Sequence, residues 1–476
     1  MKNDEIPSFI RKNKEVKWMK GMNPAQILVG GFFGLIMVAS FILMLPISSK
    51  NGQVTPFIDA LFTATSAVCV TGLSVVNTSA YWSTFGKVVL VGCIQIGGLG
   101  FMSLVSMIYI VLGKRISLKN RLVMQEALNF DTTAGVVRFT KLIVKGTFLV
   151  EGVGAILLAF TFIPQFGVVK GCAYAIFHSI SAFCNAGFDL IGDSSLTPYV
   201  GNGWVNFAII GLVILSGLGF SVWVDTVKMV TYKRKAPKHY TWKQAIGRLG
   251  LHTKLVWVIT TILLVSGFII IFILEYHNPA TLGGLSFKEK IYAALFQSVS
   301  PRTAGFNTIP LAELTDTSKL FTMILMLIGG SPAGTAGGIK TVTVGVVVLC
   351  AYNTIKGNDE IVVFKRKIAF DVVTRALTIM MISILVIFTV VGILSLTEDF
   401  TFMEILFETI SAFATVGTTL GITSGLSFVG RITIIIVMFI GRLGPVTMAV
   451  ALMVRKKDKD KHKVSIQYPE DKIMVG

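Results

Sequence analysis

The feature that most constrains this chain is a regular alternation of long and short apolar runs. Long runs occupy 25–46, 85–112, 140–163, 204–230, 255–274, 320–352, 374–396 and 429–454, and short runs between the members of each pair occupy 57–68, 173–183, 291–300 and 402–413. A membrane-spanning helix needs about 20 apolar residues, whereas runs of about 10–14 are typical of re-entrant or buried segments. The order of helix, short helix, turn and helix therefore occurs four times.

This pattern predicts an all-α membrane protein with eight transmembrane helices. The repeats occupy 23–113, 138–230, 253–352 and 374–454, and they leave an N-terminal segment at 1–22 and a C-terminal tail at 455–476. Composition agrees, because 53% of the residues are hydrophobic and only 14% are charged. Soluble domains are roughly 45–50% apolar and about 25% charged.

The chain is basic, with a formal net charge of +18, and the distribution of its Lys and Arg residues predicts the membrane topology. Of the 43 Lys and Arg residues, 33 lie in the polar stretches 1–22, 114–145, 228–254, 353–375 and 454–476. Such stretches are cytoplasmic under the positive-inside rule, which predicts that both termini are cytoplasmic. We expect them to attract anionic membrane lipid as a secondary effect. No basic patch is interleaved with aromatic residues, so we expect no nucleic-acid partner.

The N-terminal segment is polar and charged, and the apolar run that follows is long. This combination indicates an uncleaved first transmembrane helix rather than a secretory signal peptide.

The four short runs and the turns after them resemble one another. Each begins with Phe and has Ser four residues later, in the sequences FTATSAVCVTGL (62–73), FHSISAFCNAGF (177–188), FQSVSPRTAGF (296–306) and FETISAFATVGT (407–418). Each then reaches a glycine, with spacings of 115, 118 and 112 residues between Gly72, Gly187, Gly305 and Gly417. A repeat at a fixed period indicates copies of one structural unit.

The membrane environment restricts where the turn after each short helix can lie. Non-helical backbone at membrane depth is tolerated only where it is buried in protein or lines a water-filled cavity. If the four turns met around one central pore, their glycines would let carbonyl oxygens face the axis and replace the hydration shell of a cation. The short helices would also direct their partly negative C-terminal ends at it. The alternative is that each glycine only ends a short helix that packs.

On these residues the chain resembles the Ktr/Trk/HKT superfamily of potassium transporters over essentially its whole length. The resemblance rests on the four units, on VTG (70–72), NAG (185–187), TAG (303–305) and TVG (415–417), and on a glycine-rich break in the third repeat. It implies a K⁺ selectivity filter formed by the carbonyls of Val70, Thr71, Asn185, Ala186, Thr303, Ala304, Thr415 and Val416, with Gly72, Gly187, Gly305 and Gly417 at the selectivity-determining position. Some members carry Ser at the first glycine and admit Na⁺ better, so four glycines favour K⁺.

The resemblance also implies partners. A single long apolar run precedes the first filter, as in the bacterial KtrB-type branch and unlike TrkH-type proteins, which carry extra N-terminal helices. Proteins of that branch form homodimers in the plasma membrane, with one pore per subunit, and bind a cytoplasmic ring of nucleotide-binding RCK subunits of the KtrA/KtrC type. This sequence has no GxGxxG in a strand–helix context, so such a regulator would be a separate chain. Dependence on Na⁺ stays open.

The glycine-rich break lies at 329–340, in the sequence GGSPAGTAGGIK. Glycine and proline at this density are incompatible with a regular helix. The matching places IGGLGF (96–101), LSGLGF (215–220) and IGRLGP (440–445) predict only kinks. A phosphate-binding loop is excluded because Ile339 separates Gly338 from Lys340 and no strand precedes. The resemblance implies an intramembrane gate below the filter, comprising Gly329, Gly330, Ser331, Pro332, Ala333, Gly334, Thr335, Ala336, Gly337, Gly338 and Lys340; the alternative is a passive helix break.

Arg442 lies inside a long apolar run of the fourth repeat. A charge within the membrane is costly and indicates function by default. We predict that Arg442 holds the gate or opposes cations, with Lys340 as a weaker candidate, the alternative being a snorkelling or structurally paired arginine. Glu151 is expected to pair with a lysine such as Lys145, and Arg302 to pack against an acid such as Glu408.

Two other functions are compatible with a membrane chain of this composition. A Na⁺-conducting or weakly selective transporter of the same superfamily would share all these features. A membrane enzyme would need clustered His, Cys or carboxylates. The five His and five Cys show no metal-ligand spacing, so we predict that the chain is not an enzyme and that K⁺, with or without Na⁺, is what it handles.

Overall fold

The computed structural model describes residues 23–100, 118–127, 135–192, 195–235, 241–358 and 360–452. The predicted N-terminal segment and C-terminal tail, and the end of the first repeat, lie outside these residues. The chain is a helical membrane protein. Among the described helices, four are long and apolar enough to cross a membrane: α1 (Pro24–Met44), α7 (Val136–Phe166), α12 (Leu251–Glu275) and α16 (Phe370–Thr397). Counting each sharply bent helix pair as one span raises the number to six.

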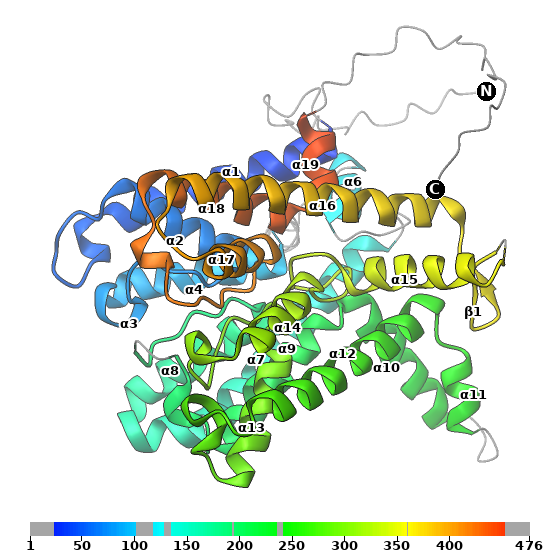
Figure 1. Ribbon diagram of the computed structural model, residues 1–476, viewed down its shortest axis with the longest axis horizontal. Helices are drawn as coiled ribbons and strands as arrows, with labels where there is room; N and C mark the ends of the chain where they lie inside the picture. Colours follow the sequence, from blue (N-terminus) through cyan, green and yellow to red (C-terminus); the bar gives the residue numbers. More distant parts are fainter. Residues whose placement is uncertain are drawn as a thin grey trace, which may run out of the picture.

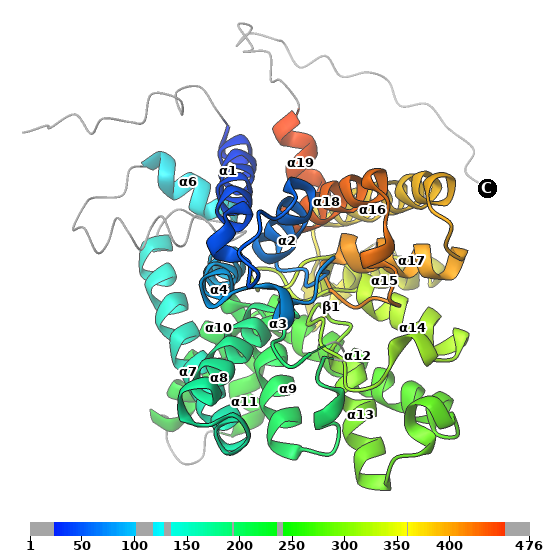
Figure 2. The same cartoon turned by 90° about the vertical axis from the view of Figure 1, so that its left-hand side faces the viewer.

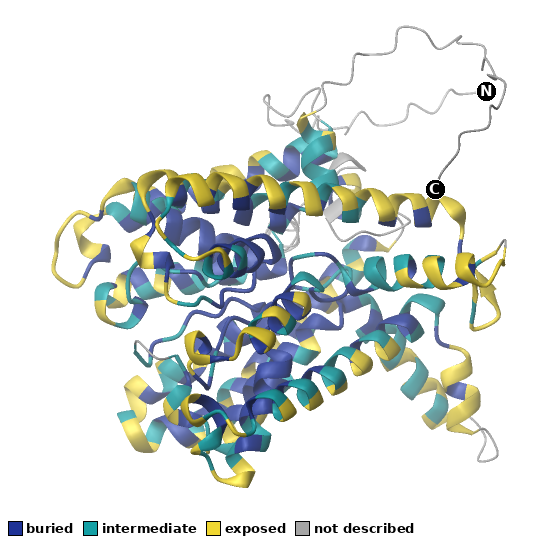
Figure 3. Cartoon of the chain, in the orientation of Figure 1, coloured by how far each residue is buried: buried dark blue, intermediate teal, exposed yellow. Residues whose placement is uncertain are grey.

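Each long helix packs against the shorter helix that follows it. These shorter helices are α2 (Phe57–Cys69), α8 (Val168–Cys184), α13 (Phe287–Val299) and α17 (Phe402–Ala414), and they match the four short apolar runs. In Figure 2 the chain-order colours pass around the molecule, from blue through teal and green to orange. The four short helices end near the centre, where burial is greatest, while the outer faces of helices such as α16 are exposed (Figure 3).

In the second and fourth repeats, the helix after the short helix is sharply broken. α9 (Gly203–Gly217) and α10 (Phe220–Lys235) meet at 97°, and α18 (Phe428–Leu443) and α19 (Pro445–Leu452) meet at 98°. The kinks predicted here are therefore nearly right-angled breaks. Gly219 and Gly444 have φ values of 88° and 86°, and a right-handed helix cannot continue through a residue with such a backbone.

In the first and third repeats, the helix after the short helix also ends where the sequence is rich in glycine. α4 (Thr84–Leu99) ends just before Gly100, the last described residue of this stretch, whose φ of 81° is close to those of Gly219 and Gly444. In the third repeat, α14 (Asp316–Leu327) and α15 (Thr341–Ile355) are separated by the predicted glycine-rich break, visible in Figure 1 between the α14 and α15 labels.

The remaining elements are short connections. The helices are α3 (Thr78–Tyr81), α6 (Leu118–Ala127) and α11 (Trp242–Gly247); the single turns are η2 (Pro46–Ser48), η3 (Thr197–Tyr199), η4 (Pro279–Gly283), η5 (Leu311–Glu313) and η6 (Thr423–Gly425). The strands β1 (Val362–Val363) and β2 (Arg366–Lys367) form an antiparallel hairpin between α15 and α16. Phe364 and Lys365, both at positive φ, make its two-residue turn.

Candidate ion pathway

Four loops of three residues follow the short helices, and we call them glycine loops 1 to 4: 70–72, 185–187, 303–305 and 415–417. In each loop the first residue has a left-handed backbone, with φ of 58° at Val70, 60° at Asn185, 76° at Thr303 and 51° at Thr415. The middle residue keeps a negative φ, and the final glycine is positive again, between 69° and 96°. Alternating the hand of successive residues turns consecutive carbonyl groups toward one side, which an ordinary extended strand does not do.

The four loops lie against one another in a closed ring. A Cβ atom built on Gly72 would meet the carbonyl oxygen of Ala186, and one on Gly187 would lie 3.0 Å from that of Ala304. One on Gly305 would lie 2.5 Å from the oxygen of Val416, and one on Gly417 would meet that of Thr71.

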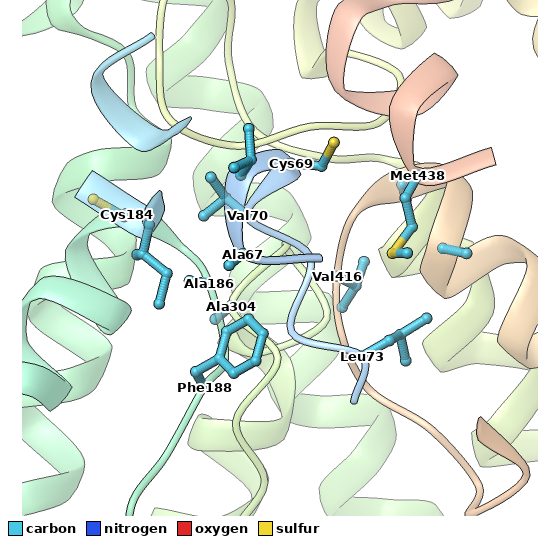
Figure 4. Close-up of a cluster of buried hydrophobic side chains, with 14 of the residues drawn as sticks. Ala67, Cys69, Val70, Leu73, Cys184, Ala186, Phe188, Ala304, Val416 and Met438 are labelled. Atoms are coloured by element: carbon cyan, nitrogen blue, oxygen red, sulfur yellow. The ribbon is translucent and has the colours of Figure 1, made fainter. Parts of the chain in front are cut away.

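Each glycine therefore faces the residue that precedes the next glycine, and the fourth loop returns to the first. Figure 4 shows Val70, Ala186, Ala304 and Val416 gathered in this region among buried apolar side chains. The structure thus brings together all four predicted loops.

The serine that recurs in each short run forms hydrogen bonds with the glycine loop of its repeat or with the residue after it. The backbone carbonyls of Ser66, Ser181, Ser300 and Ser411 accept hydrogen bonds from the middle residues of the loops, at 2.7–2.9 Å. The hydroxyls of Ser66 and Ser411 accept from the N–H of Gly72 and Gly417, at 3.0 and 3.1 Å. Those of Ser181 and Ser300 donate to the carbonyls of Phe188 and Phe306, one residue past the glycine. The serine was visible in the sequence alignment of the repeats, but its contact with the loop was not.

We expect Ser411→Ala to destabilise glycine loop 4. The substitution leaves the buried N–H of Gly417 without its partner, which costs about 1–3 kcal/mol. The thermal unfolding midpoint of the purified protein and radioactive rubidium uptake should both fall. Ser40→Ala is the matched control, because within the described part of the chain the buried Ser40 hydroxyl bonds only to the Ile36 carbonyl of its own helix. Equal losses in the two variants would contradict a specific role for Ser411.

A second polar side chain supports the segment after the glycine in two repeats. His178 and Glu408 occupy the same place in their repeats, directly after the Phe, and both are fully buried. Nε2 of His178 accepts from the backbone N–H of Leu190 at 3.2 Å. The carboxylate of Glu408 accepts from the hydroxyls of Thr419 at 2.7 Å and Thr423 at 2.5 Å.

Two predicted side-chain pairings are wrong. Glu408 bonds to threonines rather than to Arg302, and Arg302 takes part in no ion pair of the described residues; its buried Nε has no partner. Glu151 accepts from Nε2 of Gln95 at 3.0 Å rather than pairing with Lys145. The two carboxylates accept hydrogen bonds from an amide of another repeat and from hydroxyls of the turn after the glycine, and not from opposite charges.

The glycine-rich segment 329–340 lies across the break between α9 and α10. The N–H of Ser331 donates to the Gly217 carbonyl, and the N–H of Phe220 donates to the Ala333 carbonyl, both at 2.9 Å. The two ends of the segment also bond to each other, through the N–H of Gly329 and the carbonyl of Ile339 at 2.9 Å.

The other side of the segment reaches the ends of two short helices. Thr335 donates through its hydroxyl to the Phe183 carbonyl at 3.2 Å. A Cβ atom on Gly337 would lie 3.0 Å from the Ala414 carbonyl oxygen and would meet the Thr415 hydroxyl, so only glycine fits there. The segment is therefore packed directly against α8 and against the start of glycine loop 4.

Arg442 connects this segment to the first repeat. Its guanidinium donates to the carbonyl of Thr335 and to the carbonyl of Gly97, and it lies 3.4 Å from that of Gly98. Lys340 instead donates to the Ala336 carbonyl inside the segment, at 2.5 Å. Of the two basic residues, Arg442 is therefore the one that joins the segment to another repeat.

The ring of glycine loops offers backbone carbonyls rather than a cluster of metal-ligating side chains. Among the described residues no three His, Cys, Asp or Glu side chains group closely enough to hold a metal ion. The polar groups of the ring are backbone carbonyls and the threonine and asparagine side chains of the loops. Such oxygen ligands suit a hard monovalent cation.

Comparison with known proteins identifies the family. A family model described as TrkH, cation transport protein, matches residues 12–463. The chain belongs to the TrkH family. Membership of a family of cation transport proteins favours transport over the membrane-enzyme alternative.

Two curated relatives and one solved structure give the extent of the similarity. The chain is 40% identical to the Ktr system potassium uptake protein B of Bacillus subtilis, covering 98% of this chain and 100% of the relative. It is 39% identical to the potassium/sodium uptake protein NtpJ of Enterococcus hirae, covering 96% and 98%. The crystal structure of the potassium transporter TrkH from Vibrio parahaemolyticus matches with a TM-score of 0.69 at 19% identity, over 92% of this chain and 86% of that one. At that identity the likeness shows the fold alone.

Proposed function

We propose that this protein takes up K⁺ across the plasma membrane, with the four glycine loops as its selectivity filter. The single observation that carries the proposal is the closed ring of Gly72, Gly187, Gly305 and Gly417. Backbone oxygens that surround one axis replace the water around a cation, and the C-terminal ends of four helices favour positive charge there. The printed names of the relatives, which are potassium uptake proteins, support the choice of ion.

The glycine-rich segment serves as the gate in this proposal. It lies against glycine loop 4 and is held by Arg442, so its displacement would change the passage next to the filter. We further propose eight spans: the six described here, α4 with the residues after it, and α14 with α15 as one interrupted span. Both termini are then cytoplasmic, the protein acts as a homodimer, and a separate cytoplasmic RCK-type subunit regulates it.

The test is uptake in cells that lack their own potassium uptake. Expression of this chain, with and without a cytoplasmic Ktr-type subunit, should restore growth at low K⁺ and support radioactive rubidium uptake. The control is a glycine-loop variant such as Gly72→Ser that is present in the membrane in the same amount as the wild-type protein. Failure of the wild-type chain to support uptake in either setting would contradict the proposal.

A second candidate function is conduction of both K⁺ and Na⁺. The 39% identical relative from Enterococcus hirae is named a potassium/sodium uptake protein, which favours this alternative. Paired measurements of rubidium and radioactive sodium uptake in vesicles of purified protein separate the two. Equal uptake of both ions would support the second candidate; a requirement for Na⁺ without its uptake in bulk would support Na⁺ dependence of K⁺ transport.

A further inference from the structure

Asn185 differs in chemistry from its equivalents in the other glycine loops. Val70, Thr303 and Thr415 occupy the same place, and only Asn185 carries an amide that can donate and accept at once. It is 1% exposed and sits at φ 60° and ψ 47°. Asn is enriched in this left-handed region relative to other residues with a side chain, so it fits the turn without requiring glycine.

Both ends of the Asn185 amide have partners. Nδ2 donates to the Thr303 hydroxyl of glycine loop 3 at 3.3 Å, and Oδ1 accepts from the Ser216 hydroxyl of α9 at 3.0 Å. The hydroxyls of Thr71 and Thr415, in the other two loops, are buried without a partner. Within the described residues, Asn185–Thr303 is thus the only side-chain hydrogen bond that joins two glycine loops.

Ser216 lies next to the contact between α9 and the glycine-rich segment. The carbonyl of Gly217, the following residue, accepts from Ser331 of the segment at 2.9 Å. A Cβ atom on Gly334 would lie 2.9 Å from the Ser216 carbonyl oxygen, so the segment also packs on Ser216 itself. A continuous chain of contacts therefore runs from the segment through Ser216 and Asn185 to Thr303.

We propose that Asn185 is a positioning residue that couples the position of segment 329–340 to the cation preference of the filter. Movement of the segment away from Gly217 shifts Ser216, which changes the hold on Oδ1 of Asn185. Because Nδ2 of the same amide holds Thr303, glycine loops 2 and 3 respond together. This inference rests on the proposed function, since it assigns a role within that filter.

The test variant is Ser216→Ala, which removes the donor to Asn185 together with the same hydroxyl's contact with the Val213 carbonyl of its own helix, and leaves the loop sequence unchanged. We expect the ratio of rubidium to sodium uptake to fall about fivefold, the factor that corresponds to one buried neutral hydrogen bond. Thr303→Val, which removes the other partner of the amide, should shift the ratio in the same direction. Ser383→Ala is the matched control, because the buried Ser383 hydroxyl bonds, among the residues that the structure describes, only to the Ile379 carbonyl of its own helix.

A double-mutant cycle separates coupling from a structural role. Arg442→Gln removes a bond that holds the segment, so the effect of Ser216→Ala on the uptake ratio should be much smaller in that background than in the wild type. Additive effects, or a Ser216→Ala ratio equal to that of Ser383→Ala, would overturn the coupling. If Gly72→Ser changes the ratio in the same assay, the proposed function survives that outcome; if Gly72→Ser leaves it unchanged, the filter assignment itself has failed.

Discussion

Gly72→Ser should reduce the preference for K⁺ over Na⁺ by roughly tenfold or more, since an overpacked site costs about 1–3 kcal/mol and each 1.4 kcal/mol is tenfold in binding. Gly72 has a φ of 96°, and its Cβ position is occupied by the Ala186 carbonyl oxygen and lies 3.2 Å from Gly187 Cα. A serine there must displace the backbone of glycine loop 2. The oxygens around the axis then no longer surround a dehydrated K⁺ evenly. Rubidium and sodium uptake by purified protein in vesicles measures the ratio.

Because the four glycines are placed equivalently in the ring, a second glycine variant tests the same prediction. Gly305→Ser should act in the same direction, because its Cβ would lie 2.5 Å from the Val416 carbonyl oxygen. Gly92→Ser is the matched control: Gly92 lies within α4, and among the described residues no atom outside the adjoining backbone of its own helix stands within 4 Å of its Cβ position. An unaltered ratio in both Gly72→Ser and Gly305→Ser, at normal protein levels, would show that the glycine loops do not select the ion.

Arg442→Gln should raise K⁺ flux by about tenfold, because hydrogen bonds to a charged group contribute about 1.5–3 kcal/mol and their loss releases the segment that they hold. The guanidinium joins Thr335 of the segment to Gly97 of the first repeat. Without it, the segment moves more readily away from glycine loop 4. Initial rates of rubidium uptake, with and without a cytoplasmic Ktr-type subunit, report the change.

A third residue at position 442 separates the contribution of the Arg442 charge from that of its hydrogen bonds. Arg442→Lys keeps the charge but loses the planar fork that reaches two carbonyls, so high flux in this variant would assign the effect to the hydrogen bonds. Low flux in Arg442→Lys with high flux in Arg442→Gln would assign it to charge repulsion. Arg431→Gln is the control on the same helix, because Arg431 pairs with Asp59 and not with the segment. Wild-type flux in Arg442→Gln would contradict any gating role.

Hydrophobic periodicity was enough to predict most of the helices. The short runs 57–68, 291–300 and 402–413 correspond to α2, α13 and α17 within a few residues, because lipid exposure demands long apolar helices and buried short ones. The breaks at Gly219 and Gly444 were underestimated as kinks. A glycine in an apolar run marks a weak point in a helix, but the angle there is set by what packs on each side, which composition does not contain.

The candidate site also has a part that the sequence predicts and a part that it does not. The four loops, their glycines and the recurring serine could be identified from the sequence, because a repeated unit leaves a repeated pattern. The partners of Glu408, Glu151 and Asn185 could not, because Thr423, Gln95 and Ser216 lie at separations that no local rule connects. Opposite charge was a poor guide, since these buried groups are satisfied by hydroxyls and amides.

The sequence by itself determined that this is a membrane protein of four related units, in each of which a short helix is followed by a loop that ends in glycine. That follows from the cost of exposing polar backbone to lipid, which restricts such a chain to apolar helices and buried turns. Only the tertiary structure decided why glycine is needed in each loop: every Cβ position is occupied by, or in close contact with, the backbone of the next loop around the ring. It also decided that Arg442 joins the glycine-rich segment to the first repeat, because that contact depends on how the first, third and fourth repeats pack together.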